Sequence, residues 1–172
     1  MTDLKQYIRD VPDFPQPGVL FRDITPLLHD PRAFAAALDE MAAFVRARAV
    51  DAVVGIESRG FLFGTPIARQ LALPFVPIRK PGKLPSSRMT VEYSLEYGSG
   101  QLDIHADALQ PGDRVAVVDD LLATGGTAHA ASKLVELLGA VVDSHVFLVE
   151  LAGLGGRERL AGYQIHALVR YE

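Results

Sequence analysis

The stretch Val115-Ala-Val-Val-Asp-Asp-Leu-Leu-Ala-Thr-Gly-Gly-Thr127 decides the expected fold. Its first four residues form an apolar, β-branched run that is typical of a strand buried on both faces in a parallel sheet. Asp119 and Asp120 follow at the point where that strand is expected to end. Small residues then lead into a helical pattern from Ala128 to Leu138. Strand, short loop and helix in this order predict an α/β unit.

The loop after the acidic pair has the features of a phosphate-binding turn. Its glycines let the backbone approach an anion without a Cβ clash, and free N–H groups and the dipole at a helix N-terminus favour negative charge. No lysine follows the glycines, so the loop differs from the P-loop, and G-x-G-x-x-G is missing, which argues against a dinucleotide site. The alternative is an ordinary turn with two chance acids. The coincidence of acids, glycines and a helix start favours the phosphate site.

Composition restricts the class of protein. The chain has 172 residues, of which 49% are hydrophobic, enough for one globular domain with a sizeable core. A net charge of −4 argues against a broad nucleic-acid-binding face. The sequence contains 0 cysteines, which excludes disulfides and thiolate metal sites. The polar stretch 1–10 lacks the apolar core of a signal peptide or a membrane span, so we expect a soluble, cytoplasmic protein.

The remaining chain alternates strand and helix signals around a hairpin. Strands are expected at 52–56, 75–78, 144–151 and 165–169, helices at 4–9, 61–71 and from Asp30-Pro31 onward, and a hairpin within 90–105. Pro77 places its strand at an edge of the sheet or makes it irregular. This order predicts a mainly parallel sheet with helices on both faces and an inserted hairpin.

Three further segments each have two interpretations. Residues 79–88 are basic and rich in Pro, Gly and Ser, as in a solvated mobile loop or a lid that closes over a polyanion. Arg59 follows a strand at the sheet edge where open α/β sheets bind ligands, and it suits a second anion or is a surface arginine. For residues 19–24 the pattern favours packing on the core over a ligand wall that includes Phe21.

These motifs resemble the type I phosphoribosyltransferases, and from Phe14 to Glu172 the chain resembles the adenine-specific branch of that family. Four stretches carry the resemblance: Pro-Gly-Val-Leu-Phe-Arg-Asp-Ile at 17–24, Glu-Ser-Arg-Gly-Phe at 57–61, Arg-Lys-Pro-Gly-Lys-Leu-Pro at 79–85 with Tyr-Ser-Leu-Glu-Tyr-Gly at 93–98, and Val-Asp-Asp-Leu-Leu-Ala-Thr-Gly-Gly-Thr at 118–127. The last motif is shared across the family. Phe-Arg-Asp-Ile and Tyr-Ser-Leu-Glu-Tyr-Gly are the stretches that point to adenine.

The resemblance implies a fold and a reaction. A single phosphoribosyltransferase domain would span 1–172, with a base-binding hood over 1–30 and a lid loop and hairpin over 79–106. It would combine adenine with phosphoribosyl pyrophosphate to give AMP and pyrophosphate in purine salvage. Mg²⁺ would be held through pyrophosphate, ribose and water, with no direct protein ligand. The resemblance also implies a homodimer, and we expect no nucleic-acid or membrane partner.

The resemblance further implies roles for the residues that match the anion-binding motifs. The 5′-phosphate would be held by Ala123, Thr124, Gly125, Gly126 and Thr127. The ribose hydroxyls would contact the two catalytic carboxylates, Asp119 and Asp120. Pyrophosphate would be bound by Arg59, Arg79, Lys80 and Lys83. In the family the peptide before the first of these arginines is often cis, and the lid half that contains Arg88 varies, so that residue is left out of the site.

Roles toward the base are implied in the same way. Adenine would lie between Phe21 and Leu121, with backbone groups of Leu20 and Arg22 reading its edge. Glu96 would be the catalytic residue that handles the proton on the purine ring. A flat, largely apolar base suits an aromatic ring on one face and an aliphatic side chain on the other, and a glutamate in a closed site can have its pKa tuned for proton transfer.

Two alternatives belong to other functional classes. A purine-pathway regulator could keep the phosphoribosyl pyrophosphate motif as a sensor, but it would be expected to carry a basic face, whereas the isoelectric point here is about 5.7. A transferase for another purine base would need hydrogen-bond donors to ring oxygens, which the region around Phe21 does not obviously supply.

Overall fold

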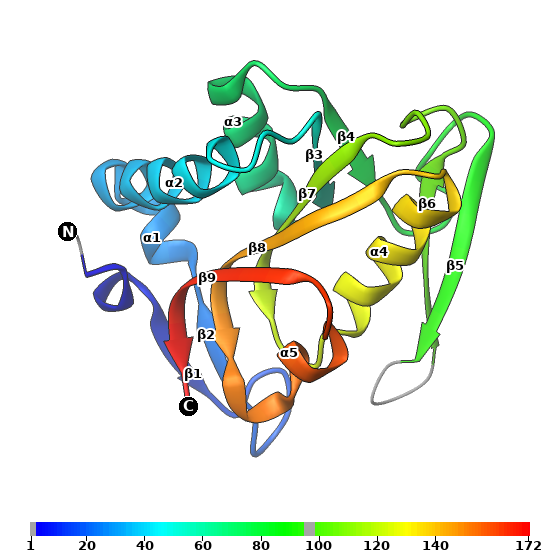
Figure 1. Ribbon diagram of the computed structural model, residues 1–172. Coiled ribbons are helices and arrows are strands. Elements are labelled where there is room, and N and C mark those ends of the chain that lie inside the picture. The colour runs from blue at the N-terminus through cyan, green and yellow to red at the C-terminus, as the bar shows by residue number, and fades with distance from the viewer. Residues whose placement is uncertain (1–2, 95–98) are drawn as a thin grey trace.

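A computed structural model describes residues 3–94 and 99–172, and a five-stranded parallel sheet forms its centre (Figure 1). The strand order is β4-β3-β7-β8-β9. These strands are β3 (Ala52–Ile56), β4 (Phe75–Ile78), β7 (Arg114–Leu122), β8 (Val141–Leu151) and β9 (Gln164–Tyr171). The helices are α1 (Thr25–His29), α2 (Pro31–Arg46), α3 (Gly60–Leu71), α4 (Gly126–Leu137) and α5 (Gly156–Arg159), with 3-10 turns η1 (Leu4–Tyr7) and η2 (Ala152–Leu154).

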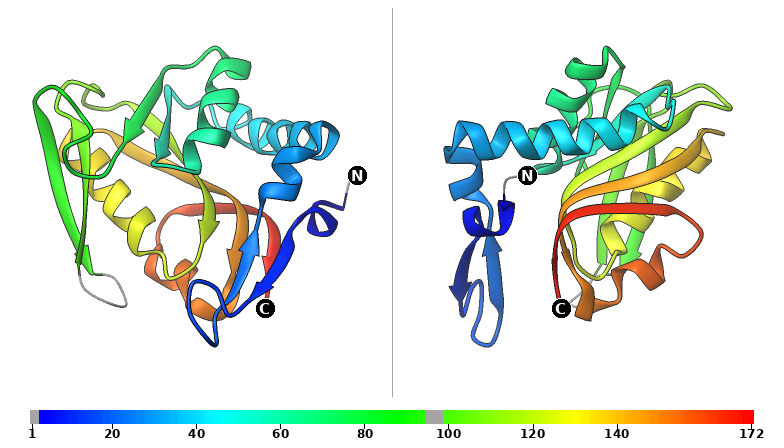
Figure 2. Two further views of the ribbon diagram at one scale, coloured as in Figure 1. Left: turned by 180° about the vertical axis from the view of Figure 1, so that it is seen from behind. Right: turned by 60° about the vertical axis from the view of Figure 1, so that its left-hand side comes forward.

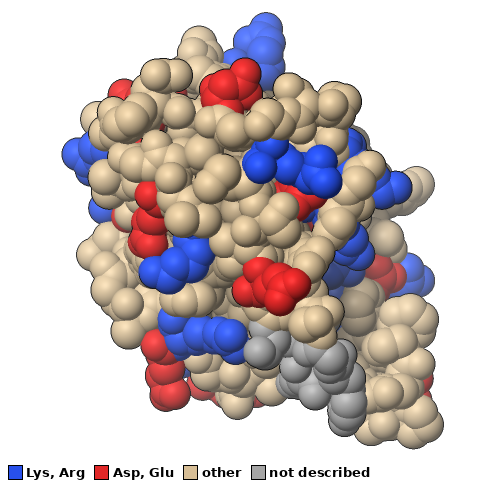
Figure 3. Space-filling model, turned by 90° about the vertical axis from the view of Figure 1, so that its right-hand side faces the viewer, with Lys and Arg blue, Asp and Glu red and all other residues tan. Residues whose placement is uncertain are grey.

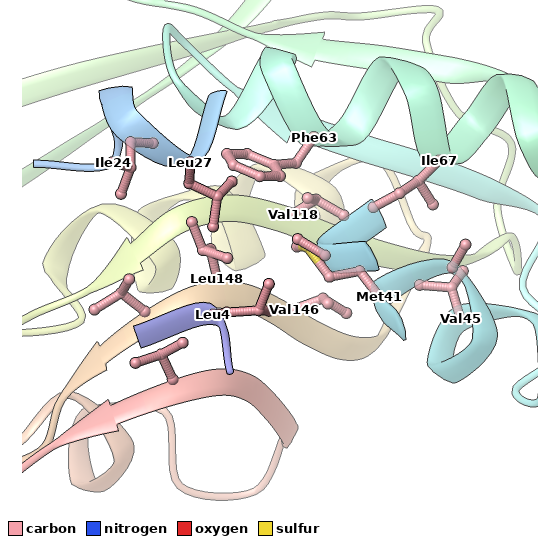
Figure 4. Close-up of a cluster of buried hydrophobic side chains, with 14 of the residues drawn as sticks. Leu4, Ile24, Leu27, Met41, Val45, Phe63, Ile67, Val118, Val146 and Leu148 are labelled. Atoms are coloured by element: carbon pink, nitrogen blue, oxygen red, sulfur yellow. The ribbon is translucent and has the colours of Figure 1, made fainter. Parts of the chain in front are cut away.

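Helices cover both faces of the sheet, as the sequence predicts (Figures 1 and 2). Alternate residues of a strand point to opposite faces, so Val118 packs with α2 and α3 while Val117 packs with α4. Figure 4 shows the first of these two cores, where Met41, Phe63 and Leu148 meet over the sheet. Because both faces are covered, β3 and residues 115–118 of β7 are apolar and buried.

Helix α2 begins where the sequence signals place it. The Asp30 side chain accepts hydrogen bonds from the backbone N–H groups of Arg32 and Ala33, both at 2.9 Å, and Pro31 occupies the first turn, where its missing N–H costs nothing. Met41 and Val45 are fully buried on the inner face. Strand β4, which contains Pro77, lies at the edge of the sheet, so the expected position of that proline is also confirmed.

Strand β7 runs further than expected. The prediction that it ends at the acidic pair is wrong, because β7 continues through Asp119 and Asp120 to Leu122. Its neighbour β8 keeps pairing with it as far as Leu122 opposite Glu150. On the other side the register with β3 stops at Gly55 opposite Val118. The two carboxylates therefore lie where β7 has lost one neighbouring strand and kept the other.

Two antiparallel hairpins flank the central sheet: β1 (Arg9–Pro12) with β2 (Leu20–Asp23), and β5 (Arg88–Ser94) with β6 (Ser99–His105). The second was expected; the first was not, because the prolines of 12–18 obscured two strands that are each four residues long. The helix expected at 4–9 is only the turn η1. The first hairpin lies beside β9 (Figure 2), where the Arg22 guanidinium is 3.8 Å from the Tyr171 ring centroid.

Candidate active site

A cavity of about 560 Å³ opens at the carboxyl ends of β3 and β7. Five segments line it: 57–59, 80–81, Tyr93, 100–102 and 119–128. The structure thus brings together segments that are up to about seventy residues apart in the sequence, as expected for an open α/β sheet, which binds ligands at this edge. Of the residues assigned to the site, those in the lining are Arg59, Lys80, Asp119, Asp120, Leu121, Ala123, Thr124, Gly125, Gly126 and Thr127.

The loop between β7 and α4 presents backbone donors to the cavity. Gly125 has φ of 79°, a left-handed conformation that L side chains rarely adopt, and it is the N-cap of α4. In the described structure no side chain caps this helix. The first intrahelical bond runs from the N–H of His129 to the Gly125 carbonyl at 2.9 Å. The N–H groups of the preceding turn therefore remain available to an anion, and the helix dipole favours one.

The acidic pair forms one side of the same cavity. Asp120 is 5% exposed, and its backbone N–H donates to Asp119 Oδ1 at 2.9 Å. Burial, followed by the neighbouring charge of Asp120, raises the pKa of Asp119 well above its ordinary value. Burial also raises the pKa of Asp120, although the Arg59 guanidinium, with Nε 2.6 Å from Asp120 Oδ2, opposes the shift. A cation or a sugar hydroxyl would favour the ionised pair.

The base of the 79–88 loop is tied to the end of β3. The Glu57 carboxylate accepts from Arg79 Nε at 3.2 Å, Arg79 Nη2 at 3.3 Å and the backbone N–H of Lys80 at 3.0 Å. Burial raises the pKa of Glu57, but these donors more than offset it and the pKa is lowered. Arg79 Nη1 also donates to the carbonyl of Lys83 at 3.1 Å. Lys80 lines the cavity, whereas Arg79 and Lys83 are not among its lining residues.

Phe21 is connected to the cavity by its contact with Arg59, which lines it. The Arg59 guanidinium carbon is 5.7 Å from the centroid of the Phe21 ring, so this arginine connects the β1–β2 hairpin to the acidic pair. Phe14 packs edge-to-face on the same ring at 5.1 Å. Leu20 is 46% exposed, and the Arg22 side chain turns away to Tyr171. The sequence assigns only the backbone groups of Leu20 and Arg22 to the base. These residues are two apart in β2, and residues two apart in an antiparallel strand direct their backbone N–H and C=O groups to the same edge, so both can face one ligand.

Glu96, the residue expected to handle the proton on the purine ring, lies outside the described residues. Among the described residues a non-proline cis peptide bond is found between Glu57 and Ser58, one bond before the Ser58–Arg59 peptide for which the resemblance suggested it.

Tyr93 and Gln101 line the cavity, but the sequence reasoning gave neither a role. Both come from the β5–β6 hairpin, which α4 packs against. Tyr93 belongs to the Tyr-Ser-Leu-Glu-Tyr-Gly stretch, and this motif was the sequence feature that could have indicated its place in the site. Gln101 could be placed only by the strand pairing, which sets it opposite Glu92.

The charge around this side of the molecule is mixed. On the face that bears the β5–β6 hairpin, basic and acidic side chains are interspersed (Figure 3). Among residues 3–94 and 99–172, no three metal-binding side chains are grouped to hold an ion, and no helix there has the length and hydropathy to cross a membrane.

An acidic pair, a glycine-threonine turn at a helix N-terminus and an arginine thus lie around one cavity, which is the arrangement expected of a protein that binds a phosphorylated ribose. Residues 27–161 match the phosphoribosyl transferase domain family. Curated relatives named adenine phosphoribosyltransferase include those of Roseiflexus sp. (strain RS-1), 55% identical, and Synechococcus sp., 54% identical, with 99% of each chain covered in both comparisons.

Solved structures agree with the sequence comparison. The adenine phosphoribosyltransferase of Thermoanaerobacter pseudethanolicus has a TM-score of 0.95 at 51% identity, covering 98% of both chains. The enzyme of Saccharomyces cerevisiae, complexed with adenine and an imino-altritol bisphosphate, has a TM-score of 0.92 at 39% identity, covering 96% of both. The chain therefore belongs to the phosphoribosyltransferases and, within them, to the adenine phosphoribosyltransferase family.

Proposed function

We propose that the chain transfers the 5-phosphoribosyl group of phosphoribosyl pyrophosphate to adenine, releasing AMP and pyrophosphate. The observation that carries this proposal is the convergence of the acidic pair, the turn before α4 and Arg59 on one cavity. Phosphoribosyl pyrophosphate carries anionic groups at both ends of a sugar, and the cavity offers anion-binding groups on either side of two carboxylates. Membership of the family supports the same reaction.

The 5′-phosphate is assigned to the turn 123–127. Backbone N–H groups at the start of α4 are unpaired within the helix, and they suit a dianionic phosphate better than a diffuse charge. Pyrophosphate is assigned to Arg59 and Lys80 in the lining, with Arg79 and Lys83 held beside them by the Glu57 network. A modest movement of the 79–88 loop would bring these two cations to the pyrophosphate and exclude water from the activated sugar.

Asp119 and Asp120 are assigned to the ribose. As pyrophosphate leaves, positive charge develops on the sugar, and ionised carboxylates nearby stabilise that charge. Asp120 is buried and Asp119 is half-buried. Such carboxylates fit sugar hydroxyls and water, which donate hydrogen bonds to them, and hard cations, which prefer oxygen ligands. Phosphoribosyltransferases generally use Mg²⁺, and we assign it here to pyrophosphate, ribose and water. When bound, Mg²⁺ neutralises the charge of the leaving pyrophosphate.

Adenine is assigned to the space between Phe21 and Leu121. Leu121 lines the cavity, and the Phe21 ring faces the guanidinium of Arg59, another lining residue. The edge of β2 that faces away from β1 is assigned to the base through backbone groups of Leu20 and Arg22, and Glu96 is assigned to the purine proton. Residues 1–30 then form the hood and 79–106 the lid of a single domain.

From the resemblance we also propose a homodimer in the cytoplasm. A phosphoribosyl pyrophosphate-sensing regulator and a transferase for another purine base are the competing functions, and formation of AMP by the purified protein distinguishes all three.

The site assignments are tested by measuring pyrophosphate and ribose 5-phosphate separately by calorimetry. Arg59→Ala is expected to weaken pyrophosphate binding about tenfold or more while ribose 5-phosphate changes less than about twofold, since a charge-assisted contact contributes about 1.5–3 kcal/mol. Thr127→Ala is expected to give the reverse pattern. If each variant weakens both ligands equally, or neither, the division of the cavity into two anion sites is wrong.

A further inference from the structure

Next to the turn 123–127, which we call the phosphate turn, a buried carboxylate outside the cavity lining is paired with a partly exposed arginine. Glu150, near the end of β8, is 2% exposed, and its two carboxylate oxygens accept from Arg157 Nε at 2.6 Å and Nη2 at 2.7 Å. Arg157 is the second residue of α5. A bidentate pair fixes the direction of the guanidinium as well as its distance, so it sets the orientation of α5 on the sheet.

Helix α5 depends on such contacts for its position. It has four residues, too few to be stable by itself. Leu160, directly after it, is fully buried with Leu122, Ala128 and Phe147. That apolar cluster anchors the end of α5, while the ion pair with Glu150 holds its beginning.

The beginning of α5 packs directly on the phosphate turn, backbone against backbone. A Cβ on Gly156 would lie 2.4 Å from the carbonyl oxygen of Ala123, and a Cβ on Gly125 would lie 2.8 Å from the carbonyl oxygen of Gly156. Such distances leave no space between the two segments. Any displacement of Gly156 is therefore transmitted to Ala123 and Gly125, whose N–H groups face the anion in the proposed function.

We infer that Glu150 and Arg157 are positioning residues for the 5′-phosphate turn: by fixing α5, their ion pair holds Gly156 against the backbone of Ala123 and Gly125. This inference rests on the proposed assignment of 123–127 to the 5′-phosphate. Neither side chain lines the cavity, so the pair acts through the turn and not by touching substrate.

The same strand supplies a matched control. Asp143, near the opposite end of β8, is a carboxylate whose side chain is 3% exposed, the same fraction as for Glu150, and it is paired with Arg48 and Arg114. Asp143→Asn therefore removes a comparably buried charge from the same strand, far along β8 from the phosphate turn.

The test compares Glu150→Gln, Arg157→Lys and Asp143→Asn in steady-state kinetics and in ribose 5-phosphate and pyrophosphate binding. Glu150→Gln and Arg157→Lys are expected to raise KM for phosphoribosyl pyrophosphate and Kd for ribose 5-phosphate about tenfold, because small misplacements of binding groups have effects of this size or larger. KM for adenine and Kd for pyrophosphate should change less than about twofold. Asp143→Asn should lower Tm but leave all four constants within about twofold.

Unchanged ribose 5-phosphate binding in a folded Glu150→Gln or Arg157→Lys protein overturns the inference, as does an equal loss in Asp143→Asn. If Glu150→Gln does not fold, Arg157→Lys, which keeps the charge and loses only the bidentate geometry, decides. Thr127→Ala separates the two levels of argument. If Thr127→Ala weakens ribose 5-phosphate binding and the ion-pair variants do not, only the inference about Glu150 and Arg157 fails. If Thr127→Ala also leaves this binding unchanged, the assignment of the turn 123–127 to the 5′-phosphate fails as well.

Discussion

Gly125→Ala should damage the phosphate turn by an amount that the structure allows to be divided into two parts. The first part is conformational: φ at this position is 79°, and an L residue in the left-handed region costs about 1–2 kcal/mol. The second is steric, because the new Cβ would lie 2.8 Å from the Gly156 carbonyl oxygen, and overpacking of this kind costs typically about 1–3 kcal/mol.

Gly112→Ala isolates the first part. Gly112 has φ of 90°, and within the described structure no atom lies within 4 Å of a Cβ built there. For a chain of this length 1 kcal/mol shifts Tm by about 2–4 °C, so Gly112→Ala should lower Tm by about 2–8 °C and leave KM values unchanged. Gly125→Ala should lower Tm further.

The assay that matters is KM for phosphoribosyl pyrophosphate. The turn can relieve the contact with Gly156 only by moving, and we expect KM to rise about tenfold or more in Gly125→Ala. A folded Gly125→Ala protein with an unchanged KM, or an equal KM increase in Gly112→Ala, would refute the reasoning that this backbone holds the 5′-phosphate.

Three other predictions concern titratable groups. The pKa of Asp119 is higher in the folded than in the unfolded protein, so the free energy of unfolding falls as pH rises above the ordinary value of 3.8. Asp119→Asn should therefore raise Tm at pH 7–8 while abolishing activity. A lower Tm in this variant at that pH would contradict the raised pKa. His145 is buried with a pKa of about 4, against an ordinary 6.5, so its contribution of about 3 kcal/mol should be lost as pH falls from 6.5 to 4; in His145→Gln, chemical denaturation should show a flatter pH dependence over that range, and an unaltered slope would exclude this histidine. Glu96→Gln should lower kcat much more than it changes KM for adenine, and an unchanged kcat would remove Glu96 from the mechanism.

The sequence predicted the parallel sheet because β-branched runs and helix-start signals such as Asp30-Pro31 are local. It placed Asp119 and Asp120 correctly beside the turn 123–127 but ended β7 too early, since the length of β7 depends on its pairing with β8, a non-local contact. The β1–β2 hairpin was missed for the same reason: four-residue strands carry little pattern of their own.

The site was predictable to the extent that its residues share short motifs. Arg59 and the turn 123–127 were found in this way and line one cavity. Gln101 and the Glu150–Arg157 pair could not be found, because nothing near them in sequence marks them as neighbours of the site. Strand pairing brings Gln101 to the cavity, whereas the ion pair is connected to the turn 123–127 only through the close approach of Gly156 to Ala123.

The most direct test of the central claim is the base specificity of the purified protein. With phosphoribosyl pyrophosphate and Mg²⁺, AMP formation from adenine should proceed with a kcat/KM at least about 10³-fold above that for hypoxanthine or guanine, as expected when a site that hydrogen-bonds one base leaves polar groups unpaired with another. Comparable turnover of an oxopurine would contradict the assignment of the Phe21 region to adenine. Absence of turnover with every base would contradict the transferase function itself.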